Sequence, residues 1–321
     1  MNRRNLLRTA VAAGALALGK PVLAEQYPTR PVTMLIPFPP GGTLDVVGRM
    51  LAQRLADQLG HNFVGDNRPG AGGTLGAGLV AKAKPDGYTL LFSPSTFVST
   101  PMTMATPPYD AVKDFAPIAL IGKAPLAIAV RPDQPFNDVK GMLAYARANP
   151  GKMTFAIGSA ASAGHLSTEL LKRAGGIDYL IVPYKGSGPA YVDLLGGNID
   201  AFVDPILGSA PYVKAGKLKV IAVTSRERLP SMPNVPTVGE TVPGYEFYSW
   251  YGMWGPAKLP REIADRLNAE VNKALASDMH AKLTEQGLLL TPGPIADFVK
   301  FQQEDTGRIM KIIKEAHIRT E

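Results

Sequence analysis

The chain has 321 residues, of which 45% are hydrophobic and 19% are charged, and its formal net charge is +7 at pH 7. This length and composition predict a globular protein with enough chain for two domains, each with its own core. Because the sequence contains no cysteine, it excludes disulfides, thiolate metal sites, cysteine nucleophiles and a lipid-modified N-terminal cysteine.

The first 24 residues predict a signal peptide. A basic start, MNRRNLLR, precedes a mildly apolar segment, TAVAAGALALG, and VLA before Glu25 has the small-residue cleavage pattern. Arg3 and Arg4 followed by NLL resemble a twin-arginine export signal, although Asn2 stands where Ser or Thr is usual. Twin-arginine export and the general secretory route therefore both remain open. Either route predicts that the protein works in the periplasm.

Most of the excess positive charge belongs to this segment. Residues 1–24 carry Arg3, Arg4, Arg8 and Lys20 and no acidic residue, so the net charge falls from +7 to +3 without them. A nucleic-acid-binding surface needs a clustered basic face. We therefore expect no nucleic-acid partner.

Short apolar runs then alternate with helical patterns, which is typical of an α/β protein. In the first part of the chain this pattern predicts strands at 32–38, 61–67 and 88–96, a helix at 43–60, a glycine turn with a small-residue helix within 68–87, and mostly loop over 99–117.

The apolar run 116–135 is broken at Gly122 and Pro125, which predicts two strands in different domains with a hinge between them. Further on, a helix over 137–151 has Asn137 or Asp138 as its N-cap. The remaining predicted elements are a strand, turn and helix within 152–176, a strand, turn, helix and strand within 177–205, a strand at 217–225, an aromatic strand within 248–260, and helices at 260–278 and 294–316.

The chain is thus expected to cross between two domains twice, near 122–126 and near 245–250. We expect residues 25–124 and 248–321 to form lobe 1 and residues 125–247 to form lobe 2. Two crossings make a hinge, and the predicted fold is a two-lobed α/β binding protein of the Venus-flytrap kind with a ligand cleft between the lobes.

Four glycine-rich turns that lead into helices are candidate anion sites. Unpaired N–H groups and the positive end of the helix dipole meet at such a turn, and glycine leaves the backbone open to a ligand. The turns are PPGGT, NRPGAGG, GSAASAGH and KGSG, and their hydroxyl donors are Thr43, Ser159, Ser162 and Ser187. We expect Asp45 to satisfy the start of its own helix, whereas Lys185 and Asp204 are candidate ligand contacts.

At these residues the chain resembles the Bug family, the periplasmic solute-binding components of tripartite tricarboxylate transporters. The resemblance covers nearly all of the chain after the signal peptide and depends on several segments: YPTRPVTMLIPFPPGGTLDVVGRMLAQRL, NRPGAGGTLGAG, KPDGYTLLF, VPYKGSGPAYVDLLGGNIDAF, AGKLKVIAVTS, PNVPTVGE and GPAKLP. It implies a monomer without cofactor or metal that holds a carboxylate between two strand–turn–helix loops and delivers it to a membrane permease.

Carried onto this sequence, the resemblance implies that Phe38–Thr43 and the 184–190 turn are the two loops, with Ser159–His165 and Asp204 lining the cleft. The full set of expected ligand-binding residues is Phe38, Pro40, Gly41, Gly42, Thr43, Ser95, Thr96, Ser159, Ala160, Ser162, Ala163, His165, Tyr184, Lys185, Gly186 and Asp204. The Pro39–Pro40 pair departs from the small residues common in the family, and Pro40 has no N–H to offer.

Members of the family bind citrate-like acids, acidic amino acids, nicotinate-like rings and aromatic dicarboxylates. Similarity to terephthalate-binding members makes an aromatic dicarboxylate the first expectation. Phe38, Phe97, Tyr184 and Trp250 are candidates for contacting a flat ring, although each is equally suited to a hydrophobic core.

A serine hydrolase is the alternative from another class. AASAG at 160–164 is a degraded nucleophile elbow, and Ser162, Asp204 and His280 occur in the required chain order. Against this, Ala160 replaces the first glycine of the elbow, and His280 lies in a helix predicted on the outside of the other lobe. His61 and His317 have no companions at metal-ligand spacing, so no metal site is expected.

Overall fold

The computed structural model describes residues 27–320, so the predicted signal peptide lies outside the described residues. The helices and strands in that range are, in chain order, β1 (Val32–Ile36), α2 (Thr43–Leu59), β2 (Phe63–Asn67), η1 (Ala71–Gly73), α3 (Thr74–Ala81), β3 (Thr89–Pro94), α4 (Thr96–Ser99), η2 (Pro101–Thr103), β4 (Phe115–Val130), α5 (Val139–Ala148), β5 (Thr154–Ile157), α6 (Ala163–Gly175), β6 (Leu180–Pro183), α7 (Ser187–Gly196), β7 (Ala201–Pro205), α8 (Ile206–Lys214), β8 (Lys219–Val223), η3 (Val238–Glu240), β9 (Tyr248–Pro256), α9 (Arg261–Leu275), α10 (Asp278–Glu285), β10 (Leu289–Leu290) and α11 (Ile295–Glu315).

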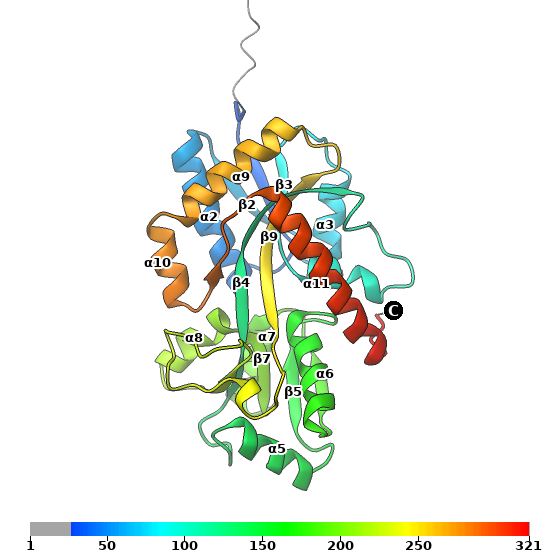
Figure 1. Cartoon of the computed structure of the whole chain (residues 1–321), viewed down its shortest axis with the longest axis vertical. Helices are drawn as coiled ribbons and strands as arrows, with labels where there is room; N and C mark the ends of the chain where they lie inside the picture. Colours follow the sequence, from blue (N-terminus) through cyan, green and yellow to red (C-terminus); the bar gives the residue numbers. More distant parts are fainter. Residues whose placement is uncertain (1–26, 321) are drawn as a thin grey trace, which may run out of the picture.

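The strands form two groups that share β4. In one group the order is β2-β1-β3-β9-β4, with β1 parallel to β2 and β3, β9 antiparallel to both of its neighbours, and β10 paired with β4. In the other group the order is β4-β7-β5-β6, and β8 also pairs with β4. Helices cover both groups, so the molecule is an α/β protein with an upper and a lower lobe (Figure 1).

One strand, β4, joins the lobes where the sequence predicted two strands. It pairs with β9 as far as Pro125, opposite Tyr248, and with β7 from Leu126 onward. Proline has no N–H for a ladder and is tolerated here because the strand changes partner at this point. Gly122 does not break the strand either. A Cβ there would lie 2.7 Å from the carbonyl oxygen of Leu289, so glycine lets β10 approach closely.

The buried clusters lie mainly within one lobe each, although the main cluster of the upper lobe extends to Ile206 and Leu207 of α8. In the upper lobe α2 and α9 pack on one face of the sheet, and the buried face of α2 presents Val47, Leu51 and Leu55 at helical spacing. In the lower lobe α5 and α6 pack on one face, whereas α7 and α8 lie on the other with Tyr191 at their contact. Asp138 caps α5 by accepting a hydrogen bond from Gly141 N–H at 2.7 Å, one of the two caps expected from the sequence.

The last helix, α11, contacts both lobes. Phe298 near its start packs with the indoles of Trp250 and Trp254, and Ile309 and Ile312 near its end belong to the core of the lower lobe. Figure 1 shows α11 running diagonally from the upper half to the side of α6. The segment 248–321, expected to belong to lobe 1, therefore ends against lobe 2.

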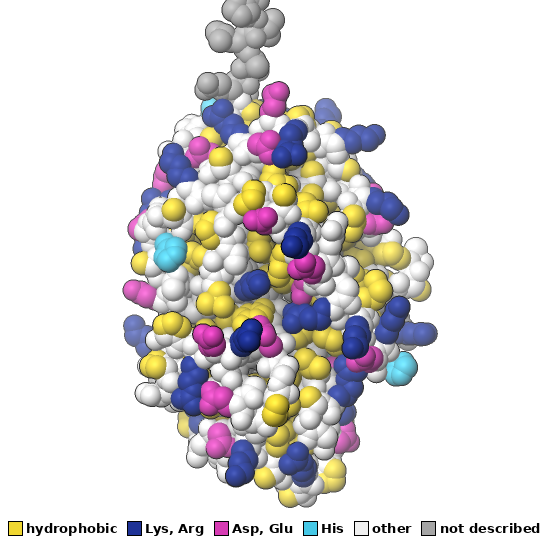
Figure 2. All heavy atoms as spheres, viewed as in Figure 1, with side chains coloured by type: hydrophobic (Ala, Val, Ile, Leu, Met, Phe, Trp, Pro, Cys, Tyr) yellow, Lys and Arg dark blue, Asp and Glu magenta, His cyan; other side chains and the backbone are white. Residues whose placement is uncertain are grey.

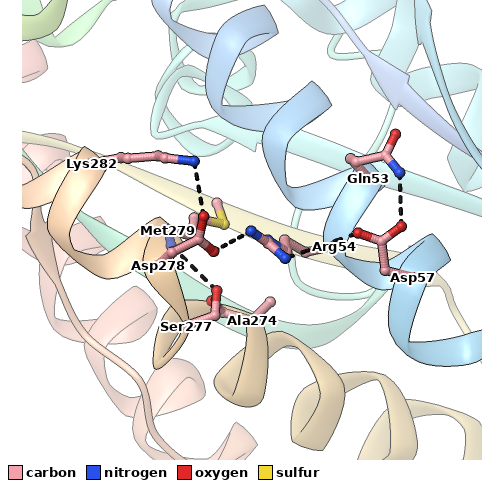
Figure 3. Close-up of polar contacts among 8 residues, drawn as sticks. All are labelled: Gln53, Arg54, Asp57, Ala274, Ser277, Asp278, Met279 and Lys282. Atoms are coloured by element: carbon pink, nitrogen blue, oxygen red, sulfur yellow. Dashed lines mark hydrogen bonds and ion pairs between the residues drawn. The ribbon is translucent and has the colours of Figure 1, made fainter.

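An ion-pair cluster joins the two outer helices of the upper lobe (Figure 3). Arg54 of α2 contacts Asp278 at the start of α10, and Asp278 also accepts a hydrogen bond from Lys282 at 2.8 Å. Ser277 caps α10 by accepting from the Met279 N–H. This cluster fixes α10 to the outer surface of the lobe.

Charges of both signs are interspersed over the face shown in Figure 2. This mixture agrees with the small net charge expected after residues 1–24. In the part of the chain that the structure describes, no helix combines the length and apolar character needed to cross a membrane.

Candidate ligand-binding site

The carboxyl ends of five strands and the segments that follow them surround a cavity of about 280 Å³ between the lobes. The strands are β1 and β3 in the upper lobe and β5, β6 and β7 in the lower lobe, and such strand ends are the usual place for ligands in open α/β sheets. The cavity is lined by Phe38, Pro39, Pro40, Gly41, Gly42, Thr43, Leu44, Pro94, Thr96, Gly158, Ser159, Ser162, Ala163, Gly164, Lys185, Gly186, Ser187, Gly188, Pro189, Asp204, Pro205, Ser249 and Tyr251.

The loop after β1 presents the N-terminus of α2 to this cavity. Gly41 has a φ of +83°, a conformation that favours glycine, and Gly42 is the N-cap residue. A glycine N-cap has no side chain to accept hydrogen bonds from the first turn, so those N–H groups are available to a ligand. The hydroxyl of Thr43, the first residue of α2, is buried without a hydrogen-bond partner among the described residues.

Asp45 holds this loop in shape. Its carboxylate accepts hydrogen bonds from the Gly41 N–H at 2.9 Å, from Arg49 Nε at 2.9 Å and from Asn67 Nδ2 at 3.0 Å. Burial by itself would raise the pKa of Asp45, but these hydrogen bonds and the charge of Arg49 hold it below its usual value. Asp45 therefore stays ionised and holds the loop before α2, but it accepts from Gly41, which precedes the helix, and not from the first-turn N–H groups that the sequence pattern predicts it to satisfy.

The loop after β6 brings the N-terminus of α7 to the opposite wall. Gly186, with a φ of +113°, is the N-cap residue of α7 and donates its N–H to the carbonyl of Gly158 at 2.7 Å. A Cβ at Gly186 would lie 3.7 Å from Cδ of Pro39, so the loops of the two lobes meet here. Two helices that face one cavity therefore each begin after a glycine N-cap residue, which has no side chain to cap the helix.

The loop after β5 is held by hydrogen bonds within itself and to the other lobe. Ser162 Oγ caps α6 by accepting from the His165 N–H at 3.2 Å, and His165 Nδ1 accepts from the Ala161 N–H at 3.0 Å. The carbonyl of Ala161 accepts a hydrogen bond from the hydroxyl of Ser99 of the upper lobe at 2.6 Å. A Cβ at Gly164 would overlap the carbonyl oxygen of Val203, so only glycine lets α6 lie this close to β7.

Asp204, at the end of β7, is the one acidic side chain among the lining residues. It is 6% exposed and accepts hydrogen bonds from Ser187 Oγ at 2.9 Å and from Tyr191 OH at 3.2 Å. Burial raises the pKa of Asp204 to about 7, although both hydrogen bonds act to lower it. Burial and the proximity of Asp204 together raise the pKa of Tyr251 far above its usual value.

Most of the residues implied by the family resemblance meet at this cavity. They are Phe38, Pro40, Gly41, Gly42, Thr43, Thr96, Ser159, Ser162, Ala163, Lys185, Gly186 and Asp204. Ala160 and Tyr184 instead line an adjoining cavity of about 660 Å³ beside the Gly70–Gly73 turn. Ser95 and His165 are absent from the lining of both cavities, because Ser95 precedes α4 inside the upper lobe and the His165 ring is directed at Ala161 and Glu169.

The aromatic candidates separate in the same way. Phe38 lines the cavity, but Phe97 and Trp250 are 2% and 1% exposed in the core of the upper lobe. Ser249 and Tyr251 of β9 line the cavity and were missed by sequence reasoning. Their alternation with Trp250 is the period of a strand, but that period does not reveal which face points to the ligand.

The arrangement is unsuited to serine hydrolysis. Ser162 Oγ is the cap of α6, and the acceptor nitrogen of the adjacent His165 is already engaged by the Ala161 N–H. Burial lowers the pKa of His165 to about 4, so the ring is neutral at pH 7. His280 lies on α10, at the outer surface of the upper lobe. Within residues 27–320 no cluster of three or more His, Asp or Glu side chains is arranged to hold a metal ion.

Comparison with known proteins relates the chain to a family of transporter receptors. Residues 47–318 match the family described as the tripartite tricarboxylate transporter family receptor. Protein BugT of Bordetella pertussis is 37% identical over 284 residues, which cover 86% of each chain.

Two solved structures from Rhodopseudomonas palustris share the fold. The protein Rpa4515, solved with adipate, is 36% identical with a TM-score of 0.88 over 91% of this chain and 99% of its own. The protein MatC, solved with bound malate, is 32% identical with a TM-score of 0.83 over 89% of this chain and 100% of its own.

Proposed function

Because this chain belongs to the tripartite tricarboxylate transporter receptor family, we propose that it captures a small dicarboxylate between its two lobes and delivers it to a membrane permease. The family consists of solute-binding receptors, so the chain is a binding protein and not an enzyme. The ligand class, the delivery step and the residues that hold the ligand are parts of the proposal.

The observation that carries the proposal is a pair of opposed helix N-termini. The first turn of α2 from the upper lobe and that of α7 from the lower lobe open on one cavity, each after a glycine N-cap. Together they offer unpaired N–H groups and two positive dipole ends to an anion. The Thr43 and Thr96 hydroxyls, both buried without partners in the described chain, lie in the same lining. A ligand oxygen would accept the hydrogen bonds that these two hydroxyls can donate.

The hinge is proposed at β4 and at the start of β9, two of the three places where the chain passes between the lobes, the third being α11. β4 changes partner at Pro125, and β9 leaves the lower lobe at Tyr248, opposite Pro125. A bend at these two points would separate Pro39 from Gly186 and open the cavity.

Two relatives were solved with aliphatic acids, which supports a dicarboxylate for this chain. Terephthalate is the first compound to test, because the rings of Phe38 and Tyr251 give the cavity wall apolar surface that suits a flat ring. Adipate and malate are the aliphatic comparisons, and citrate, nicotinate and glutamate represent the other acids of the family.

The test is a thermal-shift screen of the purified protein against these acids, followed by calorimetric titration of those that raise the Tm. A dicarboxylate with a Kd near 1 μM should raise the free energy of unfolding by about 2.7 kcal/mol at a hundredfold excess over Kd. Benzoate, which has one carboxylate, serves as the control and should shift the Tm less than terephthalate. If none of the acids moved the Tm, the proposal would be refuted.

Periplasmic location and a monomeric state complete the proposal. Fractionation of cells should recover the protein in the periplasm after cleavage next to Glu25, and replacing Arg3 and Arg4 by Lys distinguishes the two export routes. Only the twin-arginine route should be blocked by this change.

A further inference from the structure

On the basis of the proposed function, we propose that Asp204 enters the complex as a neutral carboxylic acid that donates a hydrogen bond to a ligand carboxylate. Each dicarboxylate would then be captured together with one proton. Asp204 would be the group that holds this proton.

The position of Asp204 leads to this role. The side chain lies in the cavity wall beside Ser187, the first residue of α7, and is almost completely buried. Ser187 and Tyr191 donate hydrogen bonds to its two oxygens and so fix the carboxyl group. Asp204 is a lining residue of the cavity. While Ser187 and Tyr191 both act as donors, a neutral Asp204 can donate its acid proton to a ligand carboxylate there.

Apart from the partial charge at the N-terminus of α7, no positively charged side chain among the described residues pairs with Asp204. Tyr191 from α7 and Tyr251 from β9 face Asp204, and burial keeps both phenols neutral. Tyr212 of α8 packs against the Tyr191 ring, with the ring centroids 4.9 Å apart. Within residues 27–320 Asp204 forms no ion pair with Lys or Arg, and Lys185 is an exposed residue at the rim of the cavity.

The remaining walls do not change this balance. From β4, Ala127 pairs with Asp204 and carries no charge. From the upper lobe, Thr43 and Thr96 contribute hydroxyls. In α6 the nearest titratable group, His165, has its pKa lowered to about 4 and is neutral throughout the range considered below.

Two carboxylates brought together in such a site repel each other, and the repulsion is removed at the lowest free-energy cost when one of them binds a proton. Burial already raises the pKa of Asp204 to about 7 before any ligand enters, and a ligand anion can only raise it further. Protonation also converts the repulsion into a charge-assisted hydrogen bond from the acid to the ligand. The helix N-termini and the threonine hydroxyls then bind the rest of the anion without competition from Asp204.

The sign of the pH dependence follows from linkage. Below the pKa of Asp204 the proton is already present, and the Kd is constant. Above it the proton must be taken from solution, so the Kd should rise about tenfold for each pH unit. Terephthalate and adipate are fully ionised above pH 6.5, so their own titration does not contribute to this slope.

The experiment measures the Kd of terephthalate and of adipate from pH 6.5 to 9 by calorimetry, for the wild type and for Asp204→Asn. The side-chain amide that this substitution introduces donates a hydrogen bond at every pH, so the Kd of the variant should stay flat and should be at least tenfold lower than that of the wild type at pH 9. For the wild type at pH 8.5, the binding heats in phosphate and in Tris should differ by an amount that corresponds to uptake of about one proton.

Asp200→Asn is the matched control. Asp200 lies four residues away in the same lobe and accepts hydrogen bonds from Thr154, outside the cavity. This variant should keep the wild-type pH profile. Circular dichroism and the Tm establish that each variant is folded.

A bound acid with a flat wild-type profile and no buffer-dependent heat would overturn the inference while leaving the proposed function intact. Loss of binding by folded Asp204→Asn at all pH values would likewise overturn it, because that result assigns Asp204 the role of an acceptor. Absence of binding by every variant at every pH would refute the proposed function and this inference with it.

Discussion

At the scale of single residues, the proposed site depends on polar groups that have no hydrogen-bond partner in the described chain. Glycine at both helix starts exposes backbone N–H groups, and two threonine hydroxyls are buried beside them without partners in residues 27–320. An unsatisfied buried hydroxyl costs about 1–3 kcal/mol. Thr43 and Thr96 are therefore expected to reduce the stability of the free protein. In the proposed complex a ligand oxygen would accept hydrogen bonds from both hydroxyls and offset this cost.

This predicts opposite effects of Thr43→Val on stability and on binding. The Tm of the free protein should stay the same or rise, because the unpaired hydroxyl is removed at nearly constant volume. The Kd for the dicarboxylate should rise about tenfold, which corresponds to about 1.4 kcal/mol for a hydrogen bond to a charged group. Thermal unfolding and calorimetric titration measure the two effects.

Thr291→Val is the matched control for this prediction. The Thr291 hydroxyl is also buried without a partner in the described chain, but it lies outside the cavity lining. This variant should leave the Kd unchanged. Equal affinities for wild type and Thr43→Val would remove Thr43 from the site.

At the scale of elements, β9 and α11 together hold the lobes in register. Trp250 of β9 donates its indole N–H to Asp305 of α11 at 2.6 Å, and Arg308 pairs with the same carboxylate at 2.9 Å. Trp250 and Asp305 are buried at the point where α11 passes from the upper to the lower lobe. An aromatic residue expected at the ligand is thus an anchor for the last helix.

We expect Asp305→Ala to lower the free energy of unfolding by about 1–3 kcal/mol, because it leaves the buried indole N–H unpaired. Adding Trp250→Phe in the same chain should cost less than the sum of the two single changes, since the donor is removed together with its acceptor. Urea unfolding of the four proteins measures this coupling.

The exposed pair Arg261–Asp265 provides the control for Asp305. Asp265→Ala should change the free energy of unfolding by less than about 0.5 kcal/mol, as is usual for surface positions. Strictly additive effects of Trp250→Phe and Asp305→Ala would show that the two side chains do not act as a pair.

At the scale of the whole molecule, the two lobes contact each other beside the cavity, and we expect these contacts to favour the proposed closed form. The Ser99 hydroxyl reaches the Ala161 carbonyl across the gap, and Pro39 lies against Gly186. Ser99 is absent from the cavity lining, so we expect it to influence a ligand indirectly, through its contact with the lower lobe.

Ser99→Ala should therefore raise the Kd about fivefold, which corresponds to about 1 kcal/mol for one lost hydrogen bond, mainly through faster release of the ligand. Stopped-flow measurement of association and dissociation separates the two rates. Ser167→Ala is the control, because Ser167 is equally buried but its hydroxyl bonds Tyr245 within the lower lobe. An unchanged release rate in Ser99→Ala would exclude this contact from closure.

Several elements and both helix starts at the cavity could be predicted from local sequence patterns alone. The periodicity of 43–60 predicts α2, Asp138 marks the start of α5, and the glycine turns at 41–42 and 186–188 indicate the two ends of a binding site, because these signals depend on local backbone chemistry. The same local patterns underlie the resemblance to the receptor family.

Three features depend on tertiary contacts: the course of β4, the face of β9 that lines the cavity, and the lobe that the end of α11 contacts. Gly122 and Pro125 look like strand breaks in the sequence, but Gly122 admits β10 and Pro125 lies where β4 changes partners. Trp250 and Tyr251 are adjacent in the chain, but Trp250 packs in the core and Tyr251 lines the cavity. Alternation along a strand places them on opposite faces without indicating which face is the core. Burial depends on partners distant in the chain, and no local pattern contains them.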